Sequence, residues 1–154
     1  MEKQNATSNT FGEVQLSYKK KLQIQFRSIK SSNDASKVIR QILPISQINY
    51  REHFYALYLN NKNEVIGYHL ISIGGITATM VDIRILLQGA LLCNSVGMIL
   101  IFHNHPSGKT NPSKADIALT EKISKACETI DLKLLDHIII TEDSYYSFAD
   151  NGEL

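Results

Sequence analysis

The sequence predicts a single α/β domain of the mixed α+β type, in which helices flank a mixed β-sheet. Segments with helical periodicity alternate along the chain with short apolar runs of strand length. The 154 residues, 44% of them apolar and 20% charged, have the size and composition of one globular domain. The expected order of elements, β-α-β-β-α-β-α-β-β, is typical of a mixed sheet with flanking helices.

The first part of the chain is predicted to precede the domain. Residues 1–12 are polar, and we expect them to form a disordered tail. Residues 13–30 are expected to be an extended segment, with a strand over Glu13–Arg27 where apolar residues alternate loosely. The domain itself is then predicted to cover residues 31–154.

A helix and a β-hairpin are predicted next. The stretch Ser31–Asp34 offers a helix N-cap, and apolar residues recur at helical spacing from Ala35 to Leu43. Pro44 ends this helix. The two strand-like runs His53–Leu59 and Glu64–Ile73 are joined by an Asn-rich turn, which is the pattern of a hairpin.

The second half of the chain repeats this alternation. A helix is expected over Ile83–Cys93, deeply buried because its apolar stripe is wide. The continuous apolar run Val96–Phe102 predicts a central strand that is covered on both faces. A helix beginning at Ser113 and two strands, Leu134–Thr141 and Tyr145–Phe148, complete the prediction.

A candidate metal site follows the predicted central strand. His103 and His105 stand there, and Asp116 comes eleven residues after the second histidine. Residues i and i+2 of a continuing strand point to the same face, so the two imidazoles should converge. Two histidines and a carboxylate are a ligand set of catalytic zinc, which keeps a fourth position for water. His103, His105 and Asp116 are therefore a plausible ligand set for a divalent metal ion such as Zn²⁺.

Other polar residues near this motif have competing interpretations. Ser113 and Asp116 have the spacing of a helix capping box, which is compatible with a ligand role because the box would hold both side chains in place. A metal-activated water also needs a proton acceptor, and Glu52 and Glu64 are the upstream candidates. Glu52 is favoured because it directly precedes an apolar strand, although it could be an ordinary surface carboxylate. His137 could make structural hydrogen bonds or support the metal site.

These residues resemble a known family. His103, His105, Ser113 and Asp116 match the His-x-His-x7-Ser-x2-Asp motif of the JAB/MPN (JAMM) metallo-domains. The string from His103 to Gly108, His-Asn-His-Pro-Ser-Gly, resembles the RadC-like branch in particular. The resemblance extends from about residue 30 to the C-terminus.

The resemblance implies a JAB1/MPN-type, cytidine-deaminase-like sheet flanked by helices. It implies Zn²⁺ on His103, His105 and Asp116, with water as the fourth ligand. Glu52 would be the general acid/base, and Ser113 would donate to the developing oxyanion. The implied activity is that of a zinc metallopeptidase, a hydrolase acting on an amide bond of a peptide or protein substrate.

Two other functions are kept as alternatives. One is a DNA-repair-associated accessory protein, since the family includes longer members with a DNA-associated helix-hairpin-helix segment. About 30 residues precede the domain here, so we expect no such segment. A net charge of +1 also gives no general attraction to nucleic acid. The other alternative is a non-catalytic MPN interaction module.

The composition also suggests where the protein resides. No apolar run reaches the length of a membrane span, and the polar N-terminus does not resemble a signal peptide. The two cysteines are not paired in a CxxC motif, so reduced thiols are expected. We therefore expect a cytoplasmic protein without membrane contact.

Overall fold

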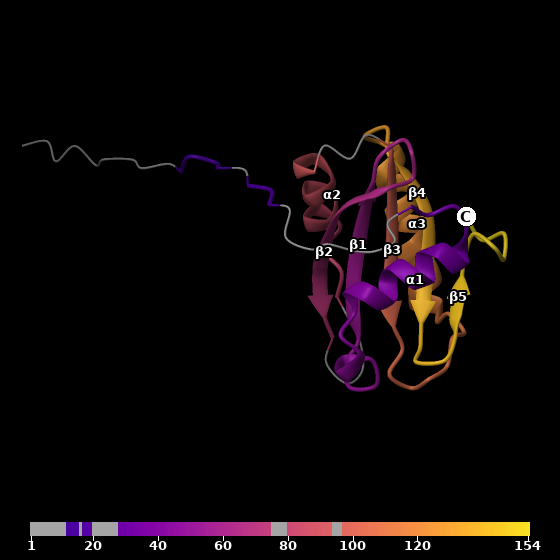
Figure 1. Ribbon diagram of the computed structural model, residues 1–154. Coiled ribbons are helices and arrows are strands. Elements are labelled where there is room, and N and C mark those ends of the chain that lie inside the picture. Colours follow the sequence, from indigo (N-terminus) through magenta and orange to yellow (C-terminus); the bar gives the residue numbers. More distant parts are fainter. Residues whose placement is uncertain (1–11, 16, 20–27, 75–79, 94–96) are drawn as a thin grey trace, which may run out of the picture.

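The sheet and its helices are visible in a computed structural model that describes residues 12–15, 17–19, 28–74, 80–93 and 97–154. One five-stranded sheet in the order β2-β1-β3-β4-β5 forms the centre (Figure 1). Its strands are β1 (His53–Leu59), β2 (Val65–Ile73), β3 (Met98–Asn104), β4 (Lys133–Ile140) and β5 (Tyr145–Ser147). The predicted fold class, a single mixed α/β domain, is confirmed.

Within the described residues, three α-helices cover the sheet. They are α1 (Ser32–Ile42), α2 (Ile83–Leu92) and α3 (Lys114–Glu128), and a short 3-10 turn, η1 (Ile45–Gln47), follows α1. Each α-helix begins after a side chain that accepts a backbone N–H: Ser31, Asp82 and Ser113 respectively. Helix α1 lies on one face of the sheet, and α2 and α3 lie on the other (Figure 1).

Strand β3 is the centre of the mixed sheet. It pairs antiparallel with β1 and parallel with β4, so that Phe54 and Ile139 both lie opposite His103. Helix α3 connects the two parallel strands, as a parallel pair requires. Residues 105–113 join the C-terminal end of β3 to the N-terminal end of α3.

Two apolar cores explain why β3 is a continuous apolar run. Leu100 and Phe102 pack on the α1 side, whereas Ile99 and Ile101 pack on the side of α2 and α3. All four side chains are completely buried. Burying each contributes about 1.5–3 kcal/mol, so this strand is a firm support for the residues at its end.

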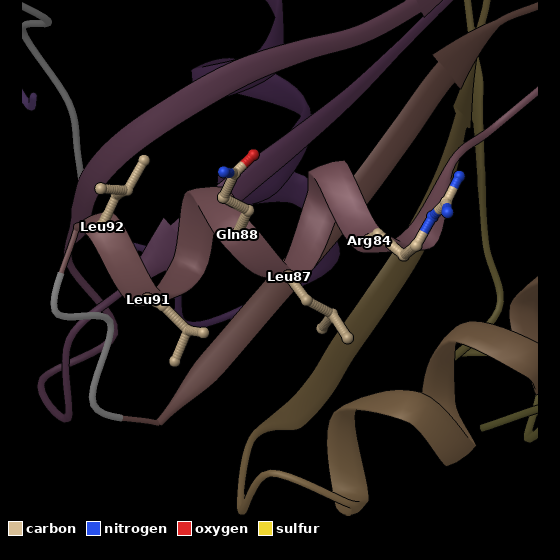
Figure 2. Close-up of a pocket in the computed structure, with 5 residues that line it drawn as sticks. All are labelled: Arg84, Leu87, Gln88, Leu91 and Leu92. Atoms are coloured by element: carbon tan, nitrogen blue, oxygen red, sulfur yellow. The ribbon is translucent and has the colours of Figure 1, made fainter. Parts of the chain in front are cut away.

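The prediction that the helix over residues 83–93 is deeply buried is wrong. Only Leu86, Gly89 and Ala90 of α2 are buried, and Leu91 is 64% exposed. The helix meets the sheet with one face, and its apolar stripe is wider than that face. Five of the remaining side chains line a pocket on α2 (Figure 2): Arg84, Leu87, Gln88, Leu91 and Leu92.

The N-terminal predictions are answered only in part. Residues 1–11, and residues 20–27 of the expected strand, lie outside the described residues. Residues 13–15 and 17–19 contain no strand; the neighbouring Ser28 forms an isolated antiparallel bridge with Glu64. Among the described residues, no α-helix combines the length and the apolar composition that crossing a bilayer requires.

Candidate metal centre

The two histidines, His103 and His105, lie at the C-terminal end of β3, close to the start of α3. His103 belongs to the strand and is nearly completely buried, with its ring stacked on Phe54 at a centroid distance of 5.8 Å. His105 lies just beyond the strand, but its N–H still donates to the Ile140 carbonyl at 3.1 Å. The parallel pairing thus continues past Asn104, which places the two imidazoles on the same side, as predicted.

Asp116 approaches the histidines from the first turn of α3. The Ser113 hydroxyl accepts the Asp116 N–H at 3.1 Å, and the Asp116 carboxylate accepts the Ser113 N–H at 2.7 Å. Ser113 and Asp116 therefore form a capping box. The Ser113 O–H also donates to the carboxylate at 2.6 Å, so the cap holds the acidic group in one orientation.

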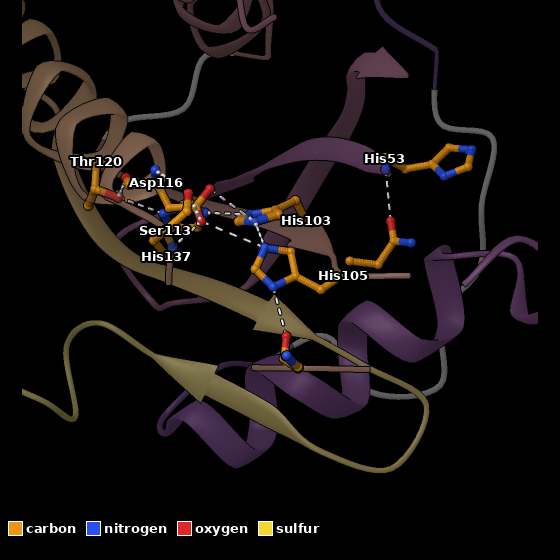
Figure 3. A network of polar contacts seen from close by, with 9 residues as sticks. His53, His103, His105, Ser113, Asp116, Thr120 and His137 are labelled. Carbon is orange, nitrogen blue, oxygen red and sulfur yellow. Dashed lines mark hydrogen bonds and ion pairs between the residues drawn. The ribbon is translucent and has the colours of Figure 1, made fainter. Parts of the chain in front are cut away.

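The three side chains converge on one point (Figure 3). The Nε2 atoms of His103 and His105 are 2.9 Å apart. The carboxylate oxygens of Asp116 lie 3.3 Å from the first and 3.6 Å from the second. The potential ligand atoms of the three residues all lie within 4.8 Å of one another, a spacing that could hold one metal ion.

The hydrogen bond on the far side of the His105 ring indicates which nitrogen is free. Its Nδ1 is 2.8 Å from the Lys109 carbonyl oxygen, which can only accept, so Nδ1 holds the proton of the neutral ring. Nε2 of neutral His105 then directs a lone pair at His103 and Asp116. Such a group of acceptors needs a cation among them, and an N₂O donor set fits Zn²⁺.

The pKa values of His105 and Asp116 also indicate that the cluster attracts a cation. The hydrogen bond to Asp116 raises the pKa of His105 above its ordinary value, and the charge of Glu52 adds to this effect. Burial opposes ionisation of Asp116, but the contacts with His103 and His105 and the hydrogen bond from Ser113 hold the pKa of its carboxyl far below the usual range. Below the raised pKa of His105, a proton on its ring would serve as the cation in the metal-free protein.

Two buried polar residues lie behind His103. Its Nδ1 is 2.9 Å from Nε2 of His137 on β4, and Nδ1 of His137 is 2.6 Å from the Thr120 hydroxyl on α3. Burial, and next the charge of His103, lower the pKa of His137 well below its ordinary value. The sequence left the role of His137 open and did not single out Thr120. The signal that could have identified Thr120 is its position, which places a hydroxyl on the apolar face of a predicted helix.

Glu52 and Glu64, the two candidate proton acceptors, lie at opposite ends of the sheet. Glu52 immediately precedes β1, whose second residue, Phe54, pairs with His103. Glu64 precedes β2 at the other end of the hairpin, where its carboxylate accepts the Asn60 amide at 3.0 Å. Only Glu52 is at the end of the sheet that contains the histidines.

Asn104 holds the segment that contains Glu52. Its buried side chain points away from the histidines and accepts the His53 N–H at 2.8 Å. Its amide donates to the Ile48 and Arg51 carbonyls at 2.8 and 2.7 Å. Both backbone neighbours of Glu52 are thus bonded to a residue located between the two histidines. The ring of His53 points away from the cluster (Figure 3).

Comparison with known proteins relates most of the chain to one family. A family model described as the RadC-like JAB domain matches residues 29–153. A UPF0758 protein of Flavobacterium johnsoniae is 46% identical over 129 residues, which are 84% of this chain and 55% of that protein.

Other relatives bear the same name. UPF0758 proteins of Streptococcus gordonii and Methanococcoides burtonii are 41% and 40% identical over 126 residues each, which are 82% of this chain. The match covers 54% and 53% of those two proteins. The chain thus spans about half the length of the relatives it matches, and their shared name states no activity.

Proposed function

Because the chain belongs to the RadC-like JAB domain family, we propose that it is a zinc-dependent metallohydrolase that cleaves an amide bond in a peptide or protein substrate. The observation that supports this proposal is the convergence of His103, His105 and Asp116, with a free lone pair on neutral His105. The ligands would be the two Nε2 atoms and the Asp116 carboxylate. Bound zinc would supply a Lewis acid that makes water a nucleophile near neutral pH.

Glu52 is the proposed general acid/base. It is half-buried at the histidine end of the sheet, and its charge acts on His105. A carboxylate in this position would accept the proton of the attacking water and deliver it to the leaving amine. The three hydrogen bonds of Asn104 restrict the movement of the backbone on both sides of Glu52, which keeps this group beside the site.

Ser113 is the proposed donor to the oxyanion of the tetrahedral intermediate. In the structure its O–H donates to Asp116. The hydroxyl can rotate towards a new acceptor, while its lone pair still caps the Asp116 N–H. Charge that develops only in the transition state would attract this proton more strongly than the ground state does, which is the requirement for catalysis.

The first test of this proposal is metal content. We expect about one zinc per chain in the natural protein after dialysis without chelator, as a single tetrahedral site requires. A His103→Ala/His105→Ala double variant should contain none. Equal, near-zero zinc in both proteins, also after incubation with added Zn²⁺, would contradict the proposal.

The second test is amide hydrolysis. A mixed peptide library would be incubated with the zinc-loaded protein, and new amino termini would be identified by mass spectrometry. Glu52→Gln is the matched control, because it preserves size and the metal ligands while removing the proton acceptor. We expect the natural protein to cleave peptides. Glu52→Gln should lower the cleavage rate at least about 100-fold, which is the lower end of the range for general acid–base catalysis. Equal cleavage by both proteins would exclude Glu52 from the reaction.

A further inference from the structure

We propose that Thr120 and His137 are positioning residues that keep Nε2 of His103 free of a proton, through a directional chain of hydrogen bonds beginning at the backbone carbonyl of Asp116. This inference rests on the proposed metal site. It assigns to two buried residues a function that packing alone would not require. The chain of contacts can be followed in Figure 3, from Thr120 through His137 to His103.

The direction of the chain is set at its first member. The Thr120 hydroxyl donates to the carbonyl of Asp116, one helical turn earlier in α3, at 2.6 Å. A carbonyl oxygen only accepts, so the single proton of this hydroxyl is committed to it. Thr120 is 1% exposed, so solvent water is not a competing partner. Its oxygen can therefore only accept from its other neighbour.

That neighbour is Nδ1 of His137, at 2.6 Å. Since the Thr120 oxygen accepts, Nδ1 of His137 must hold a proton and donate. His137 is 0% exposed, and an imidazolium buried to this degree would be very costly without an anionic partner. The ring is therefore neutral with one N–H, and its Nε2 is an acceptor.

The last link reaches the metal ligand. Nε2 of His137 lies 2.9 Å from Nδ1 of His103, which must then be the donor. In neutral His103 this leaves Nε2 as a lone pair directed at His105 and Asp116. Asp116 thus acts twice: its carboxylate is a potential ligand, and its carbonyl fixes the tautomer of another ligand.

A purely structural role is the competing interpretation. His137 also stacks on Phe148 with a centroid distance of 4.7 Å, so it contributes to the core in any case. Packing, however, does not depend on which nitrogen holds the proton. A variant that removes only the Thr120 hydroxyl therefore separates the two roles.

Thr120→Val is that variant, and Thr120→Ser is its conservative partner. Without the hydroxyl, Nδ1–H of His137 has no acceptor, so its proton moves to Nε2 and faces His103. His103 must then accept through Nδ1 and place its own proton on Nε2, where the metal would bind. We expect Thr120→Val to weaken zinc binding about 10–100-fold in competition with a chromophoric chelator. Thr120→Ser should bind zinc as the natural protein does.

Ile123→Val is the packing control, since Ile123 lies on the same helix and is also completely buried. It should lower the resistance to urea without changing the zinc affinity. Equal zinc affinity of Thr120→Val and Thr120→Ser, whether both are normal or both reduced, would overturn the proposal.

Nitrogen-15 NMR of the metal-free protein tests the same proposal without zinc. At a pH above the titration of His105, we expect an unprotonated Nε2 in His103 and a protonated Nδ1 in His137. The opposite tautomers in the natural protein would overturn the inference, even if Thr120→Val does not fold. If the tautomers are as expected but no zinc binds, the proposed function fails and the hydrogen-bond chain stands.

Discussion

Nε2 of His103 and Nε2 of His105 lie 2.9 Å apart, next to the carboxylate of Asp116. Hydrogen bonds on the far side of each ring, to His137 and to the Lys109 carbonyl, leave both atoms as lone pairs when the rings are neutral. Two lone pairs and a carboxylate at this distance require a cation. A proton and a divalent metal ion would therefore compete for one position.

This competition predicts that zinc binding strengthens as the pH rises. The pKa of His105 is raised by its hydrogen bond to Asp116, so the folded metal-free protein binds this proton more tightly than the unfolded chain. The resulting stability is fully present below the ordinary histidine value of about 6.5 and is lost as the pH rises through the raised pKa. Zinc must displace the same proton, so its stabilising effect should grow as the pH rises from about 5 towards the raised pKa of His105.

Isothermal titration calorimetry in buffers of different ionisation enthalpy measures this exchange. We expect release of up to one proton per zinc, with the largest release below the raised pKa of His105. His105→Ala should lose both the proton release and most of the affinity. A zinc affinity independent of pH over this range would mean that His105 is not a ligand.

The convergence of the three potential ligands could be predicted from the sequence more easily than the hydrogen bonds that support them. His103 and His105 were predicted to converge because their spacing matches the strand repeat, which depends on local geometry alone. Asp116 was identified through the spacing of a motif. The contact of Thr120 with His137, and those of Asn104 with segment 48–53, could not be found in this way, since only the tertiary fold brings these elements together.

In the fold, too, features set by local sequence were easier to predict than features set by tertiary packing. The hairpin, the central strand and the helix after Pro112 are defined by local periodicity, and all three are present. The burial of α2 was overestimated because periodicity indicates an apolar stripe but not how much of it the sheet covers. The predicted strand over Glu13–Arg27 depended on a weak alternation, and its described residues contain no strand.

Asn104→Ala is predicted to lower the free energy of unfolding by more than about 2 kcal/mol. The change leaves the buried His53 N–H and the carbonyls of Ile48 and Arg51 without their present partner. Urea denaturation of the metal-free protein measures the loss. Asn49→Ala is the control, because Asn49 makes one exposed bond to Glu142 and should change stability by no more than about 0.5 kcal/mol. Equal effects would refute this account of Asn104.

Gly89→Ala should destabilise the protein, although the same change in an exposed helix usually gains about 1 kcal/mol. A Cβ at Gly89 would come within 2.6 Å of ring carbon Cζ of Tyr58. The Tyr58 ring is 1% exposed, and its hydroxyl donates to the Leu86 carbonyl at 2.9 Å, so it cannot withdraw freely. We expect a loss of about 1–3 kcal/mol in urea denaturation. Gln88→Ala, on the exposed side of α2, should be nearly neutral, and a stabilising Gly89→Ala would show that Tyr58 moves.

Ser113→Ala and Ser31→Ala form a matched pair, because the chain uses the pattern Ser-x-x-Asp at the start of both α1 and α3. Each serine accepts the N–H of the aspartate three residues later, at 3.2 Å for Ser31 and 3.1 Å for Ser113. Each alanine variant should therefore lose about 1 kcal/mol of stability. Only Ser113 also donates to a potential ligand, so only Ser113→Ala should weaken zinc binding. Thermal denaturation measures the stability of each variant, and chelator competition measures its zinc affinity. Equal zinc affinity of the two variants would show that the cap of α3 does not orient Asp116.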